Sequence, residues 1–253
     1  MLYNIKIYQK SVFSVFYMRK NKKLTREMVP NIEDVSTFWD VLTHDERQYV
    51  KNNFKLHFFP KNQIIHNEGD QPTHMMLLAT GKVKVYKKIV GSRIQIIRML
   101  KPGEHFGYRA IIANQPYNTN VAAIEDSAVY MCKADFFISM LRHNNAFCYR
   151  FLEEIASDLG ASDARSIHLT QKHIRGRLAE AILQLKKSYG FEEDAATINI
   201  HLSREDLASL SNMTTSNAIR TLSNFVNERL IAIDGRKLKI INEEGLVKTS
   251  KMG

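Results

Sequence analysis

The spacing of apolar residues changes abruptly along this chain, and the change limits the folds that it can adopt. Between residues 60 and 133, short apolar runs are separated by turn-forming residues such as Gly81. Residues 144–170 contain no proline and a single glycine, Gly160. Short strands between turns are typical of a β-sandwich or roll, whereas the uninterrupted stretch favours one long helix. The sequence therefore predicts an α+β protein.

The first half of the chain fits a helical entry followed by a roll. Residues 30–50 have a helical pattern, and Thr43 with Glu46 forms a possible capping box for a second short helix. The strand candidates that follow are residues 63–65, 75–78, 82–86, 94–100 and 128–132. They are enough for one small β-roll, a jelly roll of two sheets.

The long helix carries a heptad-like seam. The residues that repeat at spacings of four and three are Cys148, Leu152, Ile155, Leu159 and Ser162. This spacing is that of the contact seam of a coiled coil, which predicts a dimer interface. A helix that packs against the core of its own domain would give a similar pattern, so both interpretations stay open.

The last third of the chain predicts two short capped helices. A helix is expected over residues 172–189, with Gly190 as its stop, and residues 198–202 alternate like a short strand. Ser203 is then an N-cap residue with an acid three places later, and Thr214 can cap a second helix that runs to about residue 228. Two short helices joined by a tight turn are the helix-turn-helix pattern.

The second helix of such a pair lies in the DNA major groove with its first turns toward the bases. Its apolar positions are expected at Ala218, Ile219, Leu222, Phe225 and Val226. The candidate DNA-binding residues are Ser203, Thr214, Thr215, Ser216, Asn217, Arg220, Arg236 and Lys237. Arg220 can bond bidentately to guanine, and Arg236 and Lys237 lie on an Asp-Gly hairpin suited to phosphate contact. A hairpin after the two helices predicts a winged helix-turn-helix. The alternative for Arg220 is an ion pair with Glu205 or Asp206 on the first helix.

Charge and composition agree with a polyanionic partner. The net charge is +10, of which residues 1–28 contribute +6, residues 29–170 +1 and residues 171–253 +3. The basic excess at the two ends suggests nucleic acid or an anionic membrane as a partner, but a solvated tail with ordinary surface lysines would give the same balance, so charge alone leaves both interpretations open. Apolar residues precede the N-terminal cations, the reverse of a signal peptide, and no apolar run is long enough to span a bilayer. We expect no membrane contact, and the small number of cysteines, Cys132 and Cys148 alone, favours the reducing cytoplasm as the compartment.

The order of roll, long helix and winged helix-turn-helix resembles the bacterial Crp/Fnr family of transcription regulators over residues 35–245. Three blocks carry the resemblance in the roll: Asn67-Glu68-Gly69-Asp70, Gly81 to Tyr86, and Lys101 to Gly107. In the last domain, residues 203–231 resemble the family's helix-turn-helix throughout. The resemblance implies a homodimer that binds palindromic double-stranded DNA and acts on RNA polymerase.

The family pattern is followed incompletely at two places. By resemblance Thr215, Ser216 and Arg220 fall on the base-reading positions, but the first two replace the commoner Arg-Glu pair. The implied DNA site therefore differs from the usual one.

The second departure concerns the effector. Cyclic-nucleotide binders of the family place Glu-Leu after Phe-Gly and, later, Arg-Ser or Arg-Thr for the cyclic phosphate. The corresponding candidate pocket residues here are Gly107, Tyr108, Arg109, Asn118 and Thr119. Because a buried phosphate needs a cation or several N–H donors, cyclic AMP should not bind in the usual mode. Two roles are open for Arg109. It could supply the positive charge for a bound phosphate from another direction, or it could pair with Glu104 or another acid as a structural residue.

Four segments are expected. They are a basic and disordered extension over residues 1–28, a β-roll over 29–143, a dimerisation helix over 144–171 and a winged helix-turn-helix over 172–253. No catalytic motif, metal site or cofactor is predicted, and the small-molecule effector is unknown. An iron–sulfur sensor is not expected because the chain lacks a cysteine cluster near its N-terminus, whereas haem binding through a histidine such as His74 or His105 stays open. The competing hypotheses are the regulatory module of a kinase or channel, and a cyclic-nucleotide-responsive regulator with a non-standard phosphate contact.

Overall fold

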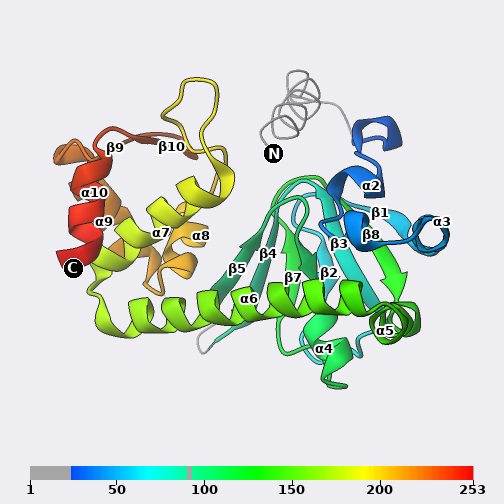
Figure 1. Cartoon of the computed structure of the whole chain (residues 1–253). Helices are drawn as coiled ribbons and strands as arrows, with labels where there is room; N and C mark the ends of the chain where they lie inside the picture. Colours follow the sequence, from blue (N-terminus) through cyan, green and yellow to red (C-terminus); the bar gives the residue numbers. More distant parts are fainter. Residues whose placement is uncertain (1–23, 90–92, 253) are drawn as a thin grey trace.

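The computed structural model describes residues 24–89 and 93–252 as a β-roll followed by a long helix and a smaller helical domain (Figure 1). The long helix α6 (Asn145–Gln171) runs beneath the roll and leads into the second domain. None of the helices in the described part of the chain is both long and apolar enough to cross a membrane. The predicted α+β architecture is confirmed.

The roll consists of two four-stranded antiparallel sheets. In the first, the strand order is β1 (Lys55–Phe59), β8 (Ser127–Lys133), β3 (His74–Thr80) and β6 (His105–Phe106). In the second, the order is β2 (Ile64–His66), β7 (Asn120–Ala123), β4 (Val83–Lys88) and β5 (Ile94–Leu100). The strands predicted for the roll all exist, but β6 and β7 were missed because they are short, and β1 because it is largely exposed. Gly91 and Ser92, between β4 and β5, lie outside the described residues.

The N-terminal region corrects two expectations. Instead of one helix over residues 30–50, the chain forms α2 (Ile32–Val35), a short 3-10 helix η3 (Trp39–Val41) and α3 (His44–Asn53). The capping box at Thr43 is confirmed, and it ends the preceding turn because an N-cap residue has extended backbone angles. Residues 24–28 belong to the predicted extension, yet they include the 3-10 helix η2 (Arg26–Met28), and Leu24 is buried. Residues 1–23 lie outside the described part.

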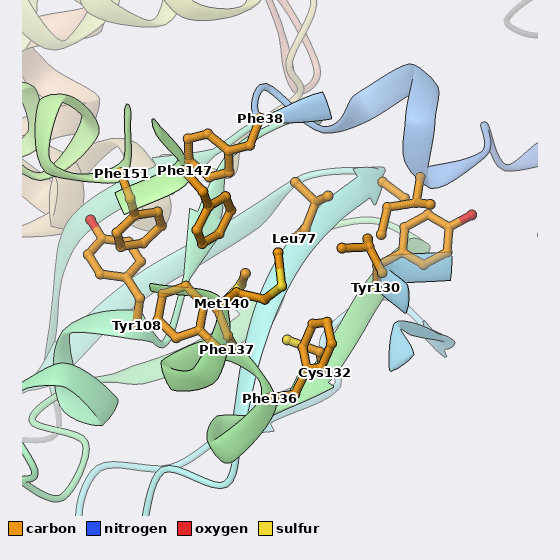
Figure 2. Close-up of a cluster of buried hydrophobic side chains, with 14 of the residues drawn as sticks. Phe38, Leu77, Tyr108, Tyr130, Cys132, Phe136, Phe137, Met140, Phe147 and Phe151 are labelled. Carbon is orange, nitrogen blue, oxygen red and sulfur yellow. The ribbon is translucent and has the colours of Figure 1, made fainter. Parts of the chain in front are cut away.

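An aromatic-rich core joins these N-terminal turns to the roll and the long helix (Figure 2). Phe38, Phe147 and Phe151 meet above the first sheet, and helix α5 (Ala134–His143) adds Phe136 and Phe137. This core anchors only the first half of α6, because Phe147 and Phe151 are its fully buried residues. Farther along the helix, Asp158 contacts the roll through polar bonds from Arg98 and Tyr108.

The C-terminal domain begins with α7 (Ile174–Tyr189), which ends at Gly190 as predicted. The helices α8 (Arg204–Leu210) and α9 (Thr215–Asn227) and the hairpin of β9 (Ile231–Asp234) and β10 (Lys237–Ile240) also follow the prediction. The strand expected over residues 198–202 is wrong: only Thr197 and Ile198 form isolated bridges. Ile198, Ile200 and Leu202 are nevertheless all buried. The alternating apolar pattern therefore reflects packing in the core of the domain and not the hydrogen-bond ladder of a strand. The short helix α4 (Tyr108–Ile112) and a final helix α10 (Glu243–Met252) were not predicted.

Candidate nucleic-acid interface

The two helices of the helix-turn-helix start where local capping places them. The Ser203 hydroxyl accepts a hydrogen bond from the Asp206 amide at 3.0 Å and donates to the Asp206 carboxylate at 2.7 Å. Thr214 accepts from the amide of Asn217 at 3.2 Å. Between the helices, Asn212 takes a positive φ of 49°, which Asn tolerates better than most residues. Ser203 and Thr214 therefore have a structural task in the motif besides any contact with DNA.

The outward face of α9 is polar and accessible. Thr215, Ser216 and Arg220 are exposed, and Asn217 is half-buried. The Arg220 guanidinium donates to the Asn217 side-chain oxygen at 2.9 Å, one turn earlier on the helix. Arg220 is thus held on the outward face by Asn217, and the alternative pairing with Glu205 or Asp206 is not what the structure contains. Asn217 and Arg220 together present donors and an acceptor to the solvent.

The buried face of α9 differs from the prediction at two residues. Ala218, Leu222 and Phe225 are buried as expected, but Ile219 and Val226 are 48% and 39% exposed. Ile219 directly follows the buried Ala218, and Val226 directly follows the buried Phe225. Successive residues of a helix point about 100° apart, so these two side chains lie beyond the edge of the buried face. Thr221 is buried instead.

The C-terminal end of α9 is fixed by an ion pair from α7. The Arg175 guanidinium donates two hydrogen bonds to the Glu228 carboxylate, at 2.9 and 2.7 Å, and lies over the Phe225 ring. A bidentate pair of this kind restrains direction as well as distance. The first turn of α9 is thus held by the Thr214 cap and its last turn by this ion pair.

The roll holds α8 at its first and last turns. Lys84 on β4 donates to the Asp206 carboxylate at 2.7 Å, and Gln95 on β5 donates to the Ser209 carbonyl at 2.8 Å. The last carbonyls of a helix have no partner within the helix, so Gln95 acts as a cap supplied by another domain. Leu210 packs against the roll beside Tyr86. These contacts link the first helix of the motif directly to the β4–β5 ribbon.

The wing, which is the hairpin of β9 and β10, carries the predicted cations Arg236 and Lys237, but only Lys237 has an acidic partner among the described residues. Gly235, with φ of 54°, makes the turn between β9 and β10. Arg236 is exposed and forms no ion pair within the described residues. Lys237 instead donates to the Glu192 carboxylate at 2.8 Å. Glu192 belongs to an acidic loop over residues 191–196, between α7 and the helix-turn-helix.

The long helix exposes an apolar stripe. Tyr149, Leu152, Leu159 and Ile167 are 64%, 58%, 62% and 52% exposed. Cys148 and Ser162 are also exposed, as the predicted seam requires. Ile155 is different, because it is half-buried and packs against the roll's aromatic core. The helix therefore has two apolar faces, one of which no residue of the described ranges 24–89 and 93–252 covers.

The candidate effector residues do not converge on one open site. Gly107 has φ of 83°, and a Cβ there would lie 2.6 Å from the Met76 methyl group. Arg109 and Asn118 are exposed, and the Arg109 guanidinium donates to the Gln115 side chain at 3.4 Å rather than to Glu104. The roll interior beside this segment is filled by Met76, Phe106 and Tyr117. Thr119 is only half-buried at the rim.

Tyr108 points away from the roll interior and toward the long helix. Its ring meets Phe151 edge-on at 5.0 Å (Figure 2). Its hydroxyl donates to the Asp158 carboxylate, which also accepts from Arg98. Burial, together with the bond to Asp158, raises the pKa of Tyr108 far above its ordinary value. Tyr108 therefore stays a neutral phenol and ties the roll to α6.

The histidines considered as haem ligands have ordinary partners. His105 is buried, stacks on Phe38 at 4.6 Å and contacts the Glu154 carboxylate at 3.2 Å. The His74 ring bonds the Thr73 hydroxyl at 2.8 Å. Within the described part of the chain, no three or more His, Cys, Asp or Glu side chains group as metal ligands would.

Comparisons with known proteins match both halves of this architecture. A cyclic nucleotide-binding domain model matches residues 56–144, and a Crp-like helix-turn-helix domain model matches residues 176–249. This chain belongs to the Crp/Fnr family. The helix-turn-helix match excludes an isolated kinase or channel module, and the chain is a Crp-like transcription regulator with a DNA-binding helix-turn-helix.

Individual relatives agree with this assignment. The CRP-like cAMP-activated global transcriptional regulator of Mycobacterium tuberculosis is 22% identical over 194 residues, 76% of this chain and 87% of that protein. The anaerobic regulatory protein of Bacillus subtilis is 21% identical over 197 residues, 77% and 83% of the two chains. The structure of FixK2 from Bradyrhizobium japonicum shares the fold, with a TM-score of 0.70 at 20% identity, over 78% of this chain and 96% of that one.

Proposed function

We propose that this regulator binds a two-half-site palindrome as a homodimer, with α9 in the major groove and α6 as the dimer contact. The observation that carries the proposal is the pairing of an exposed polar α9 face with an exposed apolar stripe on α6. Large apolar side chains that line one helix face are costly to leave in water. A second copy of the same helix covers such a stripe, and it sets two α9 helices at a fixed separation. RNA polymerase is the further partner that the family implies.

Arg220 and Asn217 are proposed as the principal base readers. Arginine bonds guanine O6 and N7 bidentately, and each such contact discriminates by about 1–3 kcal/mol against the wrong base. Selection of binding sites from random DNA tests this assignment. Arg220→Ala should flatten the preference at one base pair in each half-site. A variant that keeps the wild-type preferences while losing affinity uniformly would show that Arg220 only positions the motif.

The dimer is tested best at Leu159. A carboxylate there would be buried by the partner helix, so Leu159→Asp should sediment as a monomer and lose affinity for the palindrome. Ser157→Asp, exposed on another face of the same turn, is the matched control and should remain dimeric. Ile155 is less suitable, because its replacement also damages the core of the roll. A Leu159→Asp protein that stays dimeric would refute α6 as the interface.

The effector is proposed not to be cyclic AMP bound in the family's usual mode. Tyr108 replaces the ribose carboxylate and is committed to Asp158, and Asn118-Thr119 supplies no cation for the phosphate. Titration calorimetry with cyclic AMP should give no micromolar binding. A micromolar or tighter constant would favour the alternative, a non-standard phosphate contact, and Arg109 would be the first residue to replace.

A further inference from the structure

The wing lysines are already paired with an acidic loop. Lys237 lies 2.8 Å from the Glu192 carboxylate, and Lys239 lies 3.3 Å from the Asp194 carboxylate. The other Glu192 oxygen lies 2.6 Å from the His201 ring nitrogen. The side chains are accessible, with 50% of Lys237 and 25% of Glu192 exposed. The two lysines that could meet DNA phosphate thus have anions of this chain beside them.

The loop is held in place by the wing itself. The Ile198 amide donates to the Leu238 carbonyl, and the Ile240 amide donates to the Ala196 carbonyl, each at 2.9 Å. Asp194 then closes the turn by accepting from the Thr197 amide at 2.8 Å and hydroxyl at 2.7 Å. The acidic loop therefore forms the border of β10 on the side opposite β9.

The two paired acids of the loop, Glu192 and Asp194, stay charged at neutral pH. The bonds from Thr197 hold the pKa of Asp194 far below its ordinary value. Partial burial alone would raise the pKa of Glu192, but the hydrogen bonds from Lys237 and His201 outweigh it and lower the pKa. The hydrogen bond to Glu192 raises the pKa of Lys237. The wing therefore carries real ion pairs, and exposed pairs of this kind add little to folding stability.

We propose that the acidic loop is an intramolecular competitor for DNA phosphate, with Glu192 holding Lys237 until a phosphate replaces it. The inference rests on the proposed docking of the wing on DNA. A free lysine releases a condensed counterion when it binds phosphate. A lysine that leaves Glu192 also exposes a carboxylate that attracts a cation, so the net release is close to zero. Arg236 has no such competing carboxylate among the described residues, so its binding to phosphate contributes fully to counterion release.

The loop offers a matched pair of variants. Glu192→Gln removes the competitor, whereas Glu193→Gln removes the same charge one residue away, from a side chain that pairs with no described residue. Fluorescence anisotropy with a labelled duplex, at several salt concentrations, gives both affinity and the slope of log K against log salt. Glu192→Gln should bind about two- to fivefold tighter per subunit at low salt, and its slope should be steeper by about 0.9 per subunit. Glu193→Gln should leave the slope unchanged.

Lys237→Ala provides the second arm. In the wild-type background it should change affinity and slope little, because Lys237 gains nothing net by leaving Glu192. In the Glu192→Gln background it should cancel the gain of that variant. The proposal that Glu192 competes with phosphate would be overturned by either of two results. One is an equal effect of Lys237→Ala on DNA affinity in the two backgrounds, and the other is an equal salt slope for Glu192→Gln and Glu193→Gln.

The outcomes also separate this inference from the proposed function. If the wild-type protein and Glu192→Gln both fail to bind any duplex, the proposed DNA docking is itself refuted. If the wild-type protein binds with a normal salt slope that Glu192→Gln does not change, only the competitor is refuted. Circular dichroism of each variant confirms that the compared proteins are folded.

Discussion

The ion pair between Lys84 and Asp206 should bind the roll to the helix-turn-helix strongly enough to measure. Lys84→Met keeps most of the side-chain stem and removes the ammonium group, which donates a hydrogen bond to the Asp206 carboxylate at 2.7 Å. Asp206 would keep its bonds with Ser203, so α8 retains its cap. The substitution therefore tests the contact between domains rather than the helix.

The expected magnitude follows from burial. The Lys84 and Asp206 side chains are 19% and 18% exposed, so solvent screens the pair less than an ordinary surface pair. A hydrogen bond between charged groups contributes about 1.5–3 kcal/mol when buried, and an exposed pair contributes at most about 1 kcal/mol. We therefore expect a coupling free energy of about 1–2 kcal/mol between Lys84 and Asp206.

Urea unfolding of the wild type, Lys84→Met, Asp206→Asn and the double variant gives this coupling as a double-mutant cycle. Hydrogen exchange of the α8 amides reports whether the helix is released. Lys87→Met is the control, because Lys87 lies on the same strand but pairs with Glu68 within the roll, where the two side chains are 47% and 37% exposed. It should cost under about 0.5 kcal/mol and leave α8 unchanged.

The pH dependence has a defined sign. Burial opposes the charge on Asp206, but the bonds from Lys84 and Ser203 outweigh it and lower the pKa of this carboxyl below its ordinary value of 3.8. Its stabilising contribution is thus complete above that value and is lost only as the pH falls through the lower folded pKa. The coupling should be the same at pH 8 and pH 5. A coupling below about 0.3 kcal/mol with unchanged α8 exchange would refute the idea that the roll holds this helix.

Three further predictions concern stability and the roll. His66 is buried against Tyr117, and burial lowers its pKa from 6.5 to about 4, so its stabilising contribution is present above pH 6.5 and is lost as the pH falls toward 4. His66→Phe should therefore abolish a decrease of about 2 kcal/mol in unfolding free energy between pH 8 and pH 5, as measured by urea titration. Tyr108→Phe should cost about 1–2 kcal/mol, because Asp158 loses a buried donor, and an unchanged denaturation midpoint would contradict that bond. Phe151→Ala should cost about 3–5 kcal/mol by leaving a cavity under α6, which calorimetry would detect as a large fall in Tm.

Much of the DNA-binding half could be predicted because its signals are local. Ser203 and Thr214 satisfy amides three residues away, and the turn at Gly235 needs a positive φ that glycine provides without strain. The absence of proline and the regular apolar spacing likewise fixed the extent of α6 to within a residue at each end. These are interactions within one or two turns of the chain, which do not depend on the rest of the fold.

The sequence by itself therefore determined most of the longer elements and their order, whereas short elements such as β6 and α4 and the faces that the helices use were decided by the tertiary structure. Ile155 and Leu159 share one heptad pattern, and only the position of the roll buries the first and leaves the second 62% exposed. Lys84 and Asp206 are 122 residues apart, and Lys237 and Glu192 are 45 apart. No spacing rule relates such residues, because their distance depends on how sheets and helices pack. The partner of each charged side chain, and with it the state of the wing, follows from the three-dimensional fold alone.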